Sequence, residues 1–183
     1  MAFIDDVKSE LAELEDEKVD ARKAQVTTMI RFAGGFMNNA QKQIVMLATF
    51  DSLIAAQWLK NNIEELYNLE AHLATSTRTT PKGTHQYHVV KVERGAVNLA
   101  VATGLIDRNR AVRGLPAKIV QGKIAQVRAA WRGAFMARGI LSDLGKNPYM
   151  EIICPSNEAA MALAGLARRL GITAKPRQLS KSF

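Results

Sequence analysis

The stretch WRGAFMARG at residues 131–139 decides the fold of this chain. Together with the residue before it, the stretch places four small residues at positions i, i+3, i+4 and i+7, namely Ala130, Gly133, Ala134 and Ala137. Residues at this spacing share one face of an α-helix. We predict that a second helix packs closely against this face, and that Gly139 ends the helix where the chain turns sharply.

Apolar periodicity and capping residues predict the remaining elements. Helices are expected at residues 3–17, 22–33, 96–105 and 157–170, and a further amphipathic helix follows the capping pair Asp51-Ser52. Strands are expected at residues 43–50 and 149–154, with a hairpin formed by residues 69–78 and 86–93. The chain from Thr173 onward is expected to be an extended, basic strand.

The order helix, strand, helix, extended basic strand occurs twice. An offset of 104 residues aligns residues 32–36 with 136–140, and an offset of 105 aligns residues 49–62 with 154–167. Few aligned positions are identical, so chance alignment stays open as the alternative to an internal repeat.

Length and composition limit the possible classes of protein. At 183 residues and 48% hydrophobic content, the chain fits one domain or two small fused repeats. No apolar run approaches the ~18 residues needed to span a bilayer, and the acidic N-terminus does not resemble a signal peptide. Cys154 is the single cysteine, which excludes a disulfide framework and a cysteine-based zinc site. These features predict a soluble, cytoplasmic protein.

The net charge of +8 is unevenly distributed along the chain. Residues 1–24 carry 4 basic and 8 acidic side chains, residues 25–74 carry 3 and 4, and residues 75–183 carry 18 and 5. A basic excess confined to one part of the chain favours a polyanion-binding surface there. The alternative is a solvated surface that only maintains solubility.

Five motifs together carry a family resemblance: IRFAGG at residues 30–35, VRGLP at 112–116, AWRGAF at 130–135, ARG at 137–139 and EIICP at 151–155. The stretch at 131–139 resembles the LAGLIDADG signature of homing endonucleases. The full set, over residues 7–183, resembles the N-terminal part of the WhiA family of bacterial regulators of sporulation and cell division, with the actinobacterial branch closest. The resemblance implies an α+β, homing-endonuclease-like fold of two pseudo-symmetric αββαββα-type repeats.

The resemblance also implies a domain layout. Residues 1–20 form an N-terminal acidic helix, residues 21–106 the first repeat, residues 107–123 a basic linker and residues 124–183 the second repeat. We expect the second repeat to be incomplete, because no strand is available to pair with residues 173–183. Nothing in the sequence resembles the C-terminal helix-turn-helix domain of the family.

The resemblance does not extend to catalysis. LAGLIDADG nucleases bind divalent metal through an acid at the end of each signature helix, and hard cations require oxygen ligands. The degenerate signature positions here are Gly34-Gly35 and Arg138-Gly139. Neither Gly34 nor Arg138 supplies a carboxylate, so we expect no enzymatic activity and no metal.

Other catalytic groupings are weaker, and no cofactor is expected. His85 and His88 should lie on opposite faces of a strand, which prevents them from sharing one metal ion. His72 is expected at the surface of the hairpin. Cys154, in an apolar strand, is interpreted as a small core residue.

Cations in the predicted strands are the candidate contacts to double-stranded DNA. LAGLIDADG proteins place a saddle-shaped antiparallel sheet in the major groove, so basic residues on strands could face phosphates. The candidates are Arg78, Lys82, Lys91, Arg94, Lys175, Arg177 and Lys181. Arg138 could meet a phosphate near the centre or pair with an acid. A second candidate basic surface comprises Arg108, Arg110, Arg113 and Lys118.

A transcription regulator of this type would be nucleoid-associated and would act on sporulation, cell division or the cell cycle. We expect weak, poorly specific DNA binding, no membrane association, and a monomer because two repeats are already fused. The alternative is a protein-interaction scaffold, since the resemblance suggests cooperation with a WhiB-type regulator and the transcription machinery. An active homing endonuclease is the least favoured alternative.

Overall fold

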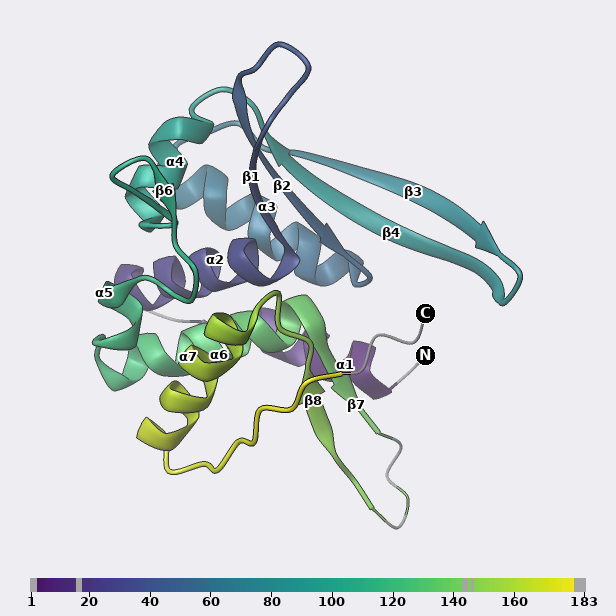
Figure 1. Ribbon diagram of the computed structural model, residues 1–183. Helices are drawn as coiled ribbons and strands as arrows, with labels where there is room; N and C mark the ends of the chain where they lie inside the picture. The colour runs from purple at the N-terminus through teal and green to yellow at the C-terminus, as the bar shows by residue number, and fades with distance from the viewer. Residues whose placement is uncertain (1–2, 16–17, 143–144, 146, 180–183) are drawn as a thin grey trace.

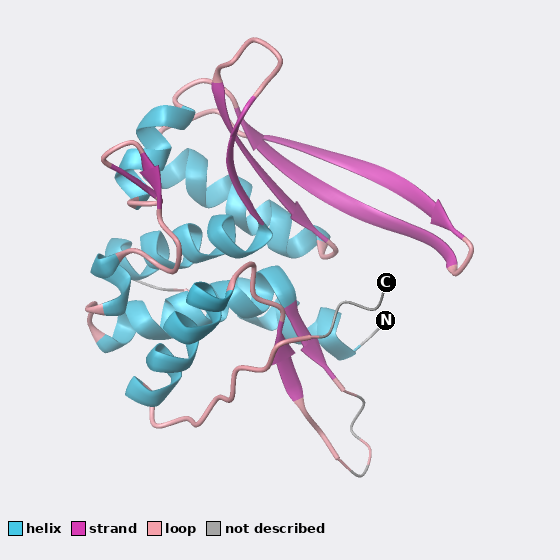
Figure 2. Cartoon of the chain, viewed as in Figure 1, coloured by secondary structure: helices cyan, strands magenta, loops and turns pink. Residues whose placement is uncertain are grey.

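The computed structural model describes residues 3–15, 18–142, 145 and 147–179 (Figure 1). The first part contains α1 (Phe3–Glu13), α2 (Val19–Ala33), β1 (Gly34–Asn38), β2 (Ile44–Phe50), α3 (Leu53–Tyr67), β3 (His72–Thr80), β4 (Gly83–Val92) and α4 (Ala96–Thr103). The second contains β5 (Ile106–Asp107), β6 (Arg110–Ala111), α5 (Ala117–Val120), α6 (Ile124–Arg138), β7 (Gly139–Leu141), β8 (Met150–Ile152) and α7 (Asn157–Arg169). Helices and strands are mixed along the chain, which confirms the α+β class (Figure 2).

The two long helices α2 and α6 pack side by side at the centre of the molecule (Figure 1). Ala130, Gly133, Ala134 and Ala137 are all buried on α6, and Ala33 is buried at the end of α2, as the spacing of small residues predicts. A Cβ added to Gly133 would lie 2.7 Å from the backbone oxygen of Gln25 on α2. The helix backbones can therefore approach this closely only because the residue at 133 is glycine.

Helix α6 ends at Gly139, as predicted, although for a different physical reason. The backbone of Gly139 is extended (φ −72°, ψ 143°) and begins β7, so no left-handed turn requires a glycine. A Cβ there would instead lie 2.3 Å from the ring of Phe135. Crowding against the preceding helical turn therefore explains the glycine.

The part of the chain predicted as the first repeat, residues 21–106, contains a four-stranded antiparallel sheet with strand order β1-β2-β4-β3. Alternate residues of β2 and β4 point into the core, and those buried there include Met46, Ala48, Phe50, Val90 and Val92. Helices α2, α3 and α4 contact these strands. The opposite face of the sheet, here called the outer face, carries the other set of alternate residues.

In the part of the chain predicted as the second repeat, β7 pairs with β8 and the chain continues into α7, which is capped by Ser156. The prediction of a strand from Thr173 onward was wrong, because residues 173–179 form no strand. A strand needs a hydrogen-bonding neighbour, and the described part of this repeat supplies none on that side. Two short strands that periodicity did not reveal, β1 and β7, directly follow the central helices.

Residues 107–123 are folded against both repeats. Arg31 of α2 donates hydrogen bonds to the carbonyl oxygens of Gly114 (3.0 Å) and Arg113 (2.6 Å). Arg169 of α7 donates to the carbonyl oxygens of Val120 (2.8 Å) and Gly122 (2.6 Å). These arginines fix the path between the repeats. Within the described residues, no helix is long and apolar enough to cross a membrane.

Candidate nucleic-acid interface

The outer face of the four-stranded sheet carries two of the predicted DNA contacts. Arg78 of β3 lies directly opposite His85 of β4, and Lys91 of β4 lies directly opposite His72 of β3. Residues that face each other across an antiparallel pair share one face. His85 and Lys91 alternate with core-facing His88, Val90 and Val92, so Arg78 and Lys91 both lie on the outer face.

Two more candidates lie at the ends of the β3–β4 hairpin. Lys82 is exposed in the turn, and Arg94 is exposed just after β4. The Lys91 ammonium lies 2.7 Å from the Glu93 carboxylate, and this hydrogen bond lowers the pKa of Glu93. The pair is exposed, so its contribution to stability is small and it can exchange for a phosphate contact.

The histidines of the hairpin lie as the strand periodicity predicts. His88 is 6% exposed on the core face, and its Nδ1 lies 2.8 Å from the Thr75 hydroxyl. His85 is exposed on the outer face, and His72 is exposed beside Glu70. Within the described chain, no group of three or more His, Cys, Asp or Glu side chains is placed to hold a metal ion.

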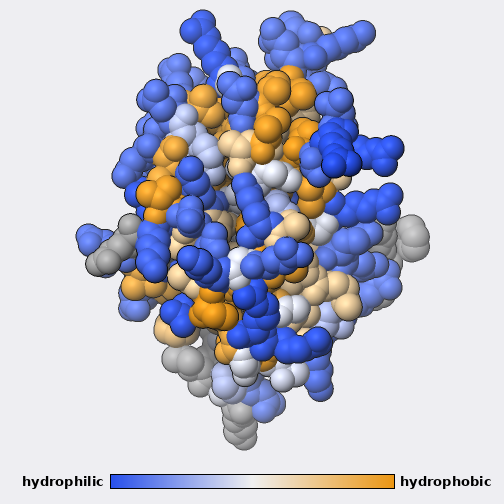
Figure 3. All heavy atoms as spheres, turned by 90° about the vertical axis from the view of Figure 1, so that its left-hand side faces the viewer, coloured by the Kyte–Doolittle hydropathy of each residue, from blue (hydrophilic) through white to orange (hydrophobic). Residues whose placement is uncertain are grey.

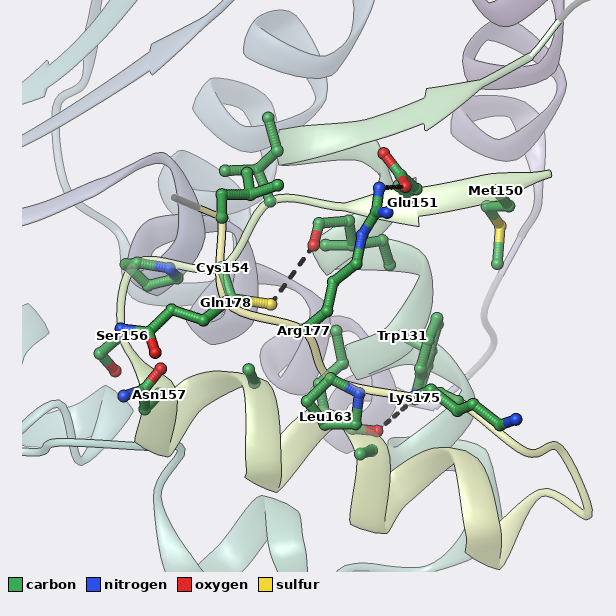
Figure 4. Close-up of a pocket in the computed structure, with 18 of the residues that line it drawn as sticks. Trp131, Met150, Glu151, Cys154, Ser156, Asn157, Leu163, Lys175, Arg177 and Gln178 are labelled. Carbon is green, nitrogen blue, oxygen red and sulfur yellow. Dashed lines mark hydrogen bonds and ion pairs between the residues drawn. The ribbon is translucent and has the colours of Figure 1, made fainter. Parts of the chain in front are cut away.

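The basic segment at residues 173–179 crosses the second repeat beside a groove of about 790 Å³ (Figure 4). Trp131, Ile152, Cys154 and Leu163 line the groove. Arg177 forms an ion pair with Glu151, and both Arg177 and Lys175 are exposed. Lys181 lies outside the described residues. The cations of this segment therefore do not share the face of a strand, and one of them already has an acidic partner.

Cys154 lies just after β8 and is half-buried, less so than expected for a core residue. Burial raises the pKa of its thiol. Because the thiolate is the reactive form, we expect Cys154 to be alkylated by iodoacetamide more slowly than a free cysteine at pH 8. Mass spectrometry of timed, quenched samples measures this rate. Labelling as fast as that of a cysteine in unfolded protein would contradict the buried placement.

At the centre of the molecule, Arg138 binds backbone oxygens. Its guanidinium donates to the carbonyl oxygens of Thr49 (2.7 Å), Ala137 (2.9 Å) and Ala33 (3.2 Å). Ala33 is the last residue of α2, so the cation lies where both central helices end and their dipoles favour positive charge. Burial lowers the pKa of Arg138, and nearby Asp51 opposes this effect.

At the other degenerate signature position, residue 34, strand packing requires a glycine. A Cβ at Gly34 would lie 1.9 Å from the carbonyl oxygen of Leu47 on β2. Any side chain here, including a metal-binding carboxylate, would displace β2. At the end of α2, Gly34 therefore has no room for a side chain. At the end of α6, the guanidinium of Arg138 is already hydrogen-bonded to backbone carbonyl oxygens.

Lys8 is a buried residue of this region that sequence reasoning missed. It is 6% exposed on α1, which contacts α3, α6 and β7. Burial lowers the pKa of Lys8, while Asp51 and Asp5 raise it. Periodicity predicts apolar residues on the inner face of this helix, but it cannot show that Asp51, between β2 and α3, would be near enough to raise the pKa of Lys8.

In the second candidate basic surface, all four cations are exposed, and one of them, Lys118, is hydrogen-bonded to the backbone. Arg108, Arg110 and Arg113 are exposed on or just after the β5–β6 hairpin. The Lys118 ammonium donates to the carbonyl oxygen of Ala102, at the end of α4.

The arrangement of paired central helices and flanking sheets defines a LAGLIDADG-like domain. The fold is similar to the crystal structure of the N-terminal LAGLIDADG domain of DUF199/WhiA (TM-score 0.72, 15% identity, covering 98% of this chain and 80% of that one). It is also similar to I-DmoI crystallised with DNA and Mn (TM-score 0.54, 14% identity, covering 85% of this chain and 81% of that one). At such identities, the likeness concerns the fold alone.

Sequence comparisons identify the family. Residues 19–106 match the WhiA N-terminal LAGLIDADG-like domain, and residues 127–183 match the WhiA LAGLIDADG-like domain. The chain therefore belongs to the WhiA family. It is 54% identical over 183 residues to the probable cell division protein WhiA of Bifidobacterium longum subsp. infantis, and 43% identical over 185 residues to that of a Mycobacterium species. Both alignments cover the whole of this chain, but only 58% and 55% of the length of these relatives.

Proposed function

We propose that this chain is the non-catalytic DNA-binding domain of a WhiA-type transcription regulator that acts in cell division and sporulation. The observation that carries the proposal is the outer face of the four-stranded sheet, where Arg78 and Lys91 are directed away from the helices. Arg94 and Lys82 extend the positive charge to both ends of the hairpin. The DNA present in the I-DmoI complex, a protein of the same fold, supports this choice of ligand.

The contacts proposed are to phosphates, which position a protein on the duplex without reading its sequence. Long, exposed lysine and arginine side chains on a strand face suit this task, and phosphate binding falls with rising salt. We therefore propose weak and poorly specific binding to double-stranded DNA. The two fused repeats already supply both halves of the pseudo-twofold arrangement, so the proposed species is a monomer associated with the nucleoid.

Absence of catalysis is the second part of the proposal. A LAGLIDADG nuclease needs carboxylates converging on metal at the ends of the central helices. Here Gly34 cannot carry a side chain without displacing β2, and Arg138 directs a positive charge at the same place. A cation at this position repels a divalent metal, so the domain is proposed to bind DNA without cutting it.

Charge reversal on the outer face tests the DNA interface. The double variant Arg78→Glu/Lys91→Glu should lower the affinity for a duplex at least tenfold, and should make the log–log salt slope less steep by about two. Fluorescence anisotropy with a labelled duplex measures both quantities. Both side chains are exposed or half-exposed, so folding should be unchanged.

The double variant Arg128→Glu/Arg168→Glu is the matched control, because it makes the same change in charge at exposed positions on α6 and α7. It should retain most of the affinity. Equal losses in the two variants would mean that net charge alone governs binding, and would remove the outer face as the interface.

A further inference from the structure

Helix α4 presents an apolar face that the described chain leaves uncovered. Its sequence, AVNLAVAT, contains no charged side chain. Leu99 and Ala100 are buried beneath it, whereas Val97 is 52% and Val101 is 65% exposed. These valines are four residues apart and so lie on the same side of the helix. A surface helix ordinarily carries charged or polar side chains on its exposed side.

Cations lie on the hairpin next to α4 and at the C-terminal end of this helix. The β5–β6 hairpin contacts α4 through β5 and carries exposed Arg108 and Arg110 (Figure 1). At the C-terminal end of α4, Lys118 is held in place by its hydrogen bond to the carbonyl oxygen of Ala102. Figure 3 looks onto this side of the molecule and shows apolar side chains gathered between hydrophilic ones.

The tip of the β5–β6 hairpin is a tight two-residue turn. Arg108 and Asn109 both have positive φ angles, 46° and 63°. A two-residue turn with positive φ at both positions is the tight type that matches the twist of a hairpin. Asparagine tolerates this region, whereas arginine is uncommon there. The turn places Arg108 at the tip of the hairpin whose first strand, β5, contacts α4.

We propose that the α4 face, defined as Val97, Val101, Arg108, Arg110 and Lys118, binds an acidic amphipathic helix of a partner protein. Apolar residues of the partner would pack on the two valines at helical spacing. Its carboxylates would meet the surrounding cations, which gives the contact a preferred orientation and a salt-sensitive association rate. Exposed valines have no favourable contact to make with a phosphate backbone, so the chemistry favours protein over DNA.

The proposed contact is small and therefore transient. Figure 1 shows α4 at the opposite end of the sheet from the tip of the β3–β4 hairpin. A partner on the α4 face would thus lie far from Lys82 at that tip, although Arg94 directly precedes the N-cap of α4. The proposal does not depend on DNA binding.

The probe is a fluorescein-labelled synthetic helix with leucines at i, i+4 and i+7 and glutamates at its other surface positions. It is titrated with the full chain and followed by anisotropy at low salt. Saturable binding is expected. The variants Val97→Ser/Val101→Ser and Arg108→Glu/Arg110→Glu should each weaken it at least tenfold. A second peptide with lysines in place of the glutamates should not bind.

The control variant replaces an exposed valine and an exposed methionine that lie outside the α4 face. Val120→Ser/Met161→Ser removes two other exposed apolar side chains and should leave peptide binding unchanged. Binding that is insensitive to Val97 and Val101, or absent at low salt, would overturn the proposal. Light scattering that shows a dimer lost in Val97→Ser/Val101→Ser would instead assign the face to a second copy of this chain. The valine variant should not alter duplex binding, which separates this test from that of the DNA interface.

Discussion

Replacement of Gly133 by alanine is expected to destabilise the domain by about 1–3 kcal/mol, because it overpacks the central helix pair. The added methyl group would lie 2.7 Å from the backbone oxygen and 3.3 Å from the Cα of Gln25. Backbone atoms cannot move aside as the end of a flexible side chain can, so α2 and α6 must separate. Separation would loosen the buried contacts of Ala130 and Ala134. Urea unfolding followed by circular dichroism measures the change.

Gly165→Ala is the matched control, since Gly165 also lies within a helix but has no atom within 4 Å of an added Cβ. Alanine is the better helix former, so this variant should be more stable by roughly 0.5–1 kcal/mol. The two substitutions are chemically identical and are expected to have opposite signs. A stabilised Gly133→Ala variant would show that the central helices do not approach as closely as described.

Arg138→Met is expected to cost about 3 kcal/mol of stability. Methionine fills a similar volume but leaves the half-buried carbonyl oxygens of Thr49 and Ala33 without their donor, and each lost acceptor bond costs roughly 1–3 kcal/mol. The loss should appear as a lower urea midpoint. Arg128→Met makes the same change at an exposed position of the same helix and should alter stability by no more than about 0.5 kcal/mol.

Variants of Arg138 also distinguish a purely structural role of this residue from a contact with a phosphate. If Arg138 only holds carbonyl oxygens, Arg138→Met should lower stability and leave the salt slope of duplex binding unchanged. If Arg138 binds a phosphate, its replacement by methionine should make that slope less steep by about one, with little change in the urea midpoint. The second result would contradict the description of the helix ends.

The sequence was most informative where spacing alone determines the structure. Small residues at i, i+3, i+4 and i+7 predict the buried face of α6, and alternation predicts that His85 and His88 face opposite ways. The capping residues Ser52 and Ser156 both accept hydrogen bonds from the first turns of their helices. In each case, the evidence for the element lies within a few neighbouring residues.

Features that depend on distant residues could not be predicted. Gly34 was interpreted as the end of a helix, but it also begins β1, because only glycine fits against Leu47. Two of the three carbonyl partners of Arg138, Ala33 and Thr49, lie 105 and 89 residues earlier in the chain. The alternation of Lys175 and Arg177 predicts a strand, yet a strand forms only beside another, and Glu151 holds Arg177 instead. Lys8 is likewise buried on α1, and the acid that most raises its pKa, Asp51, belongs to another part of the chain.

The most direct test of the account is duplex binding measured by fluorescence anisotropy over a salt series in the presence of Mg²⁺, with the DNA then examined on a denaturing gel. We predict salt-sensitive binding with a log–log slope of roughly −4 to −6, from about four to seven phosphate contacts, and intact DNA. Absence of binding at low salt, or a slope near zero, would contradict the proposed interface. Cut DNA would contradict the argument that Gly34 and Arg138 prevent catalysis.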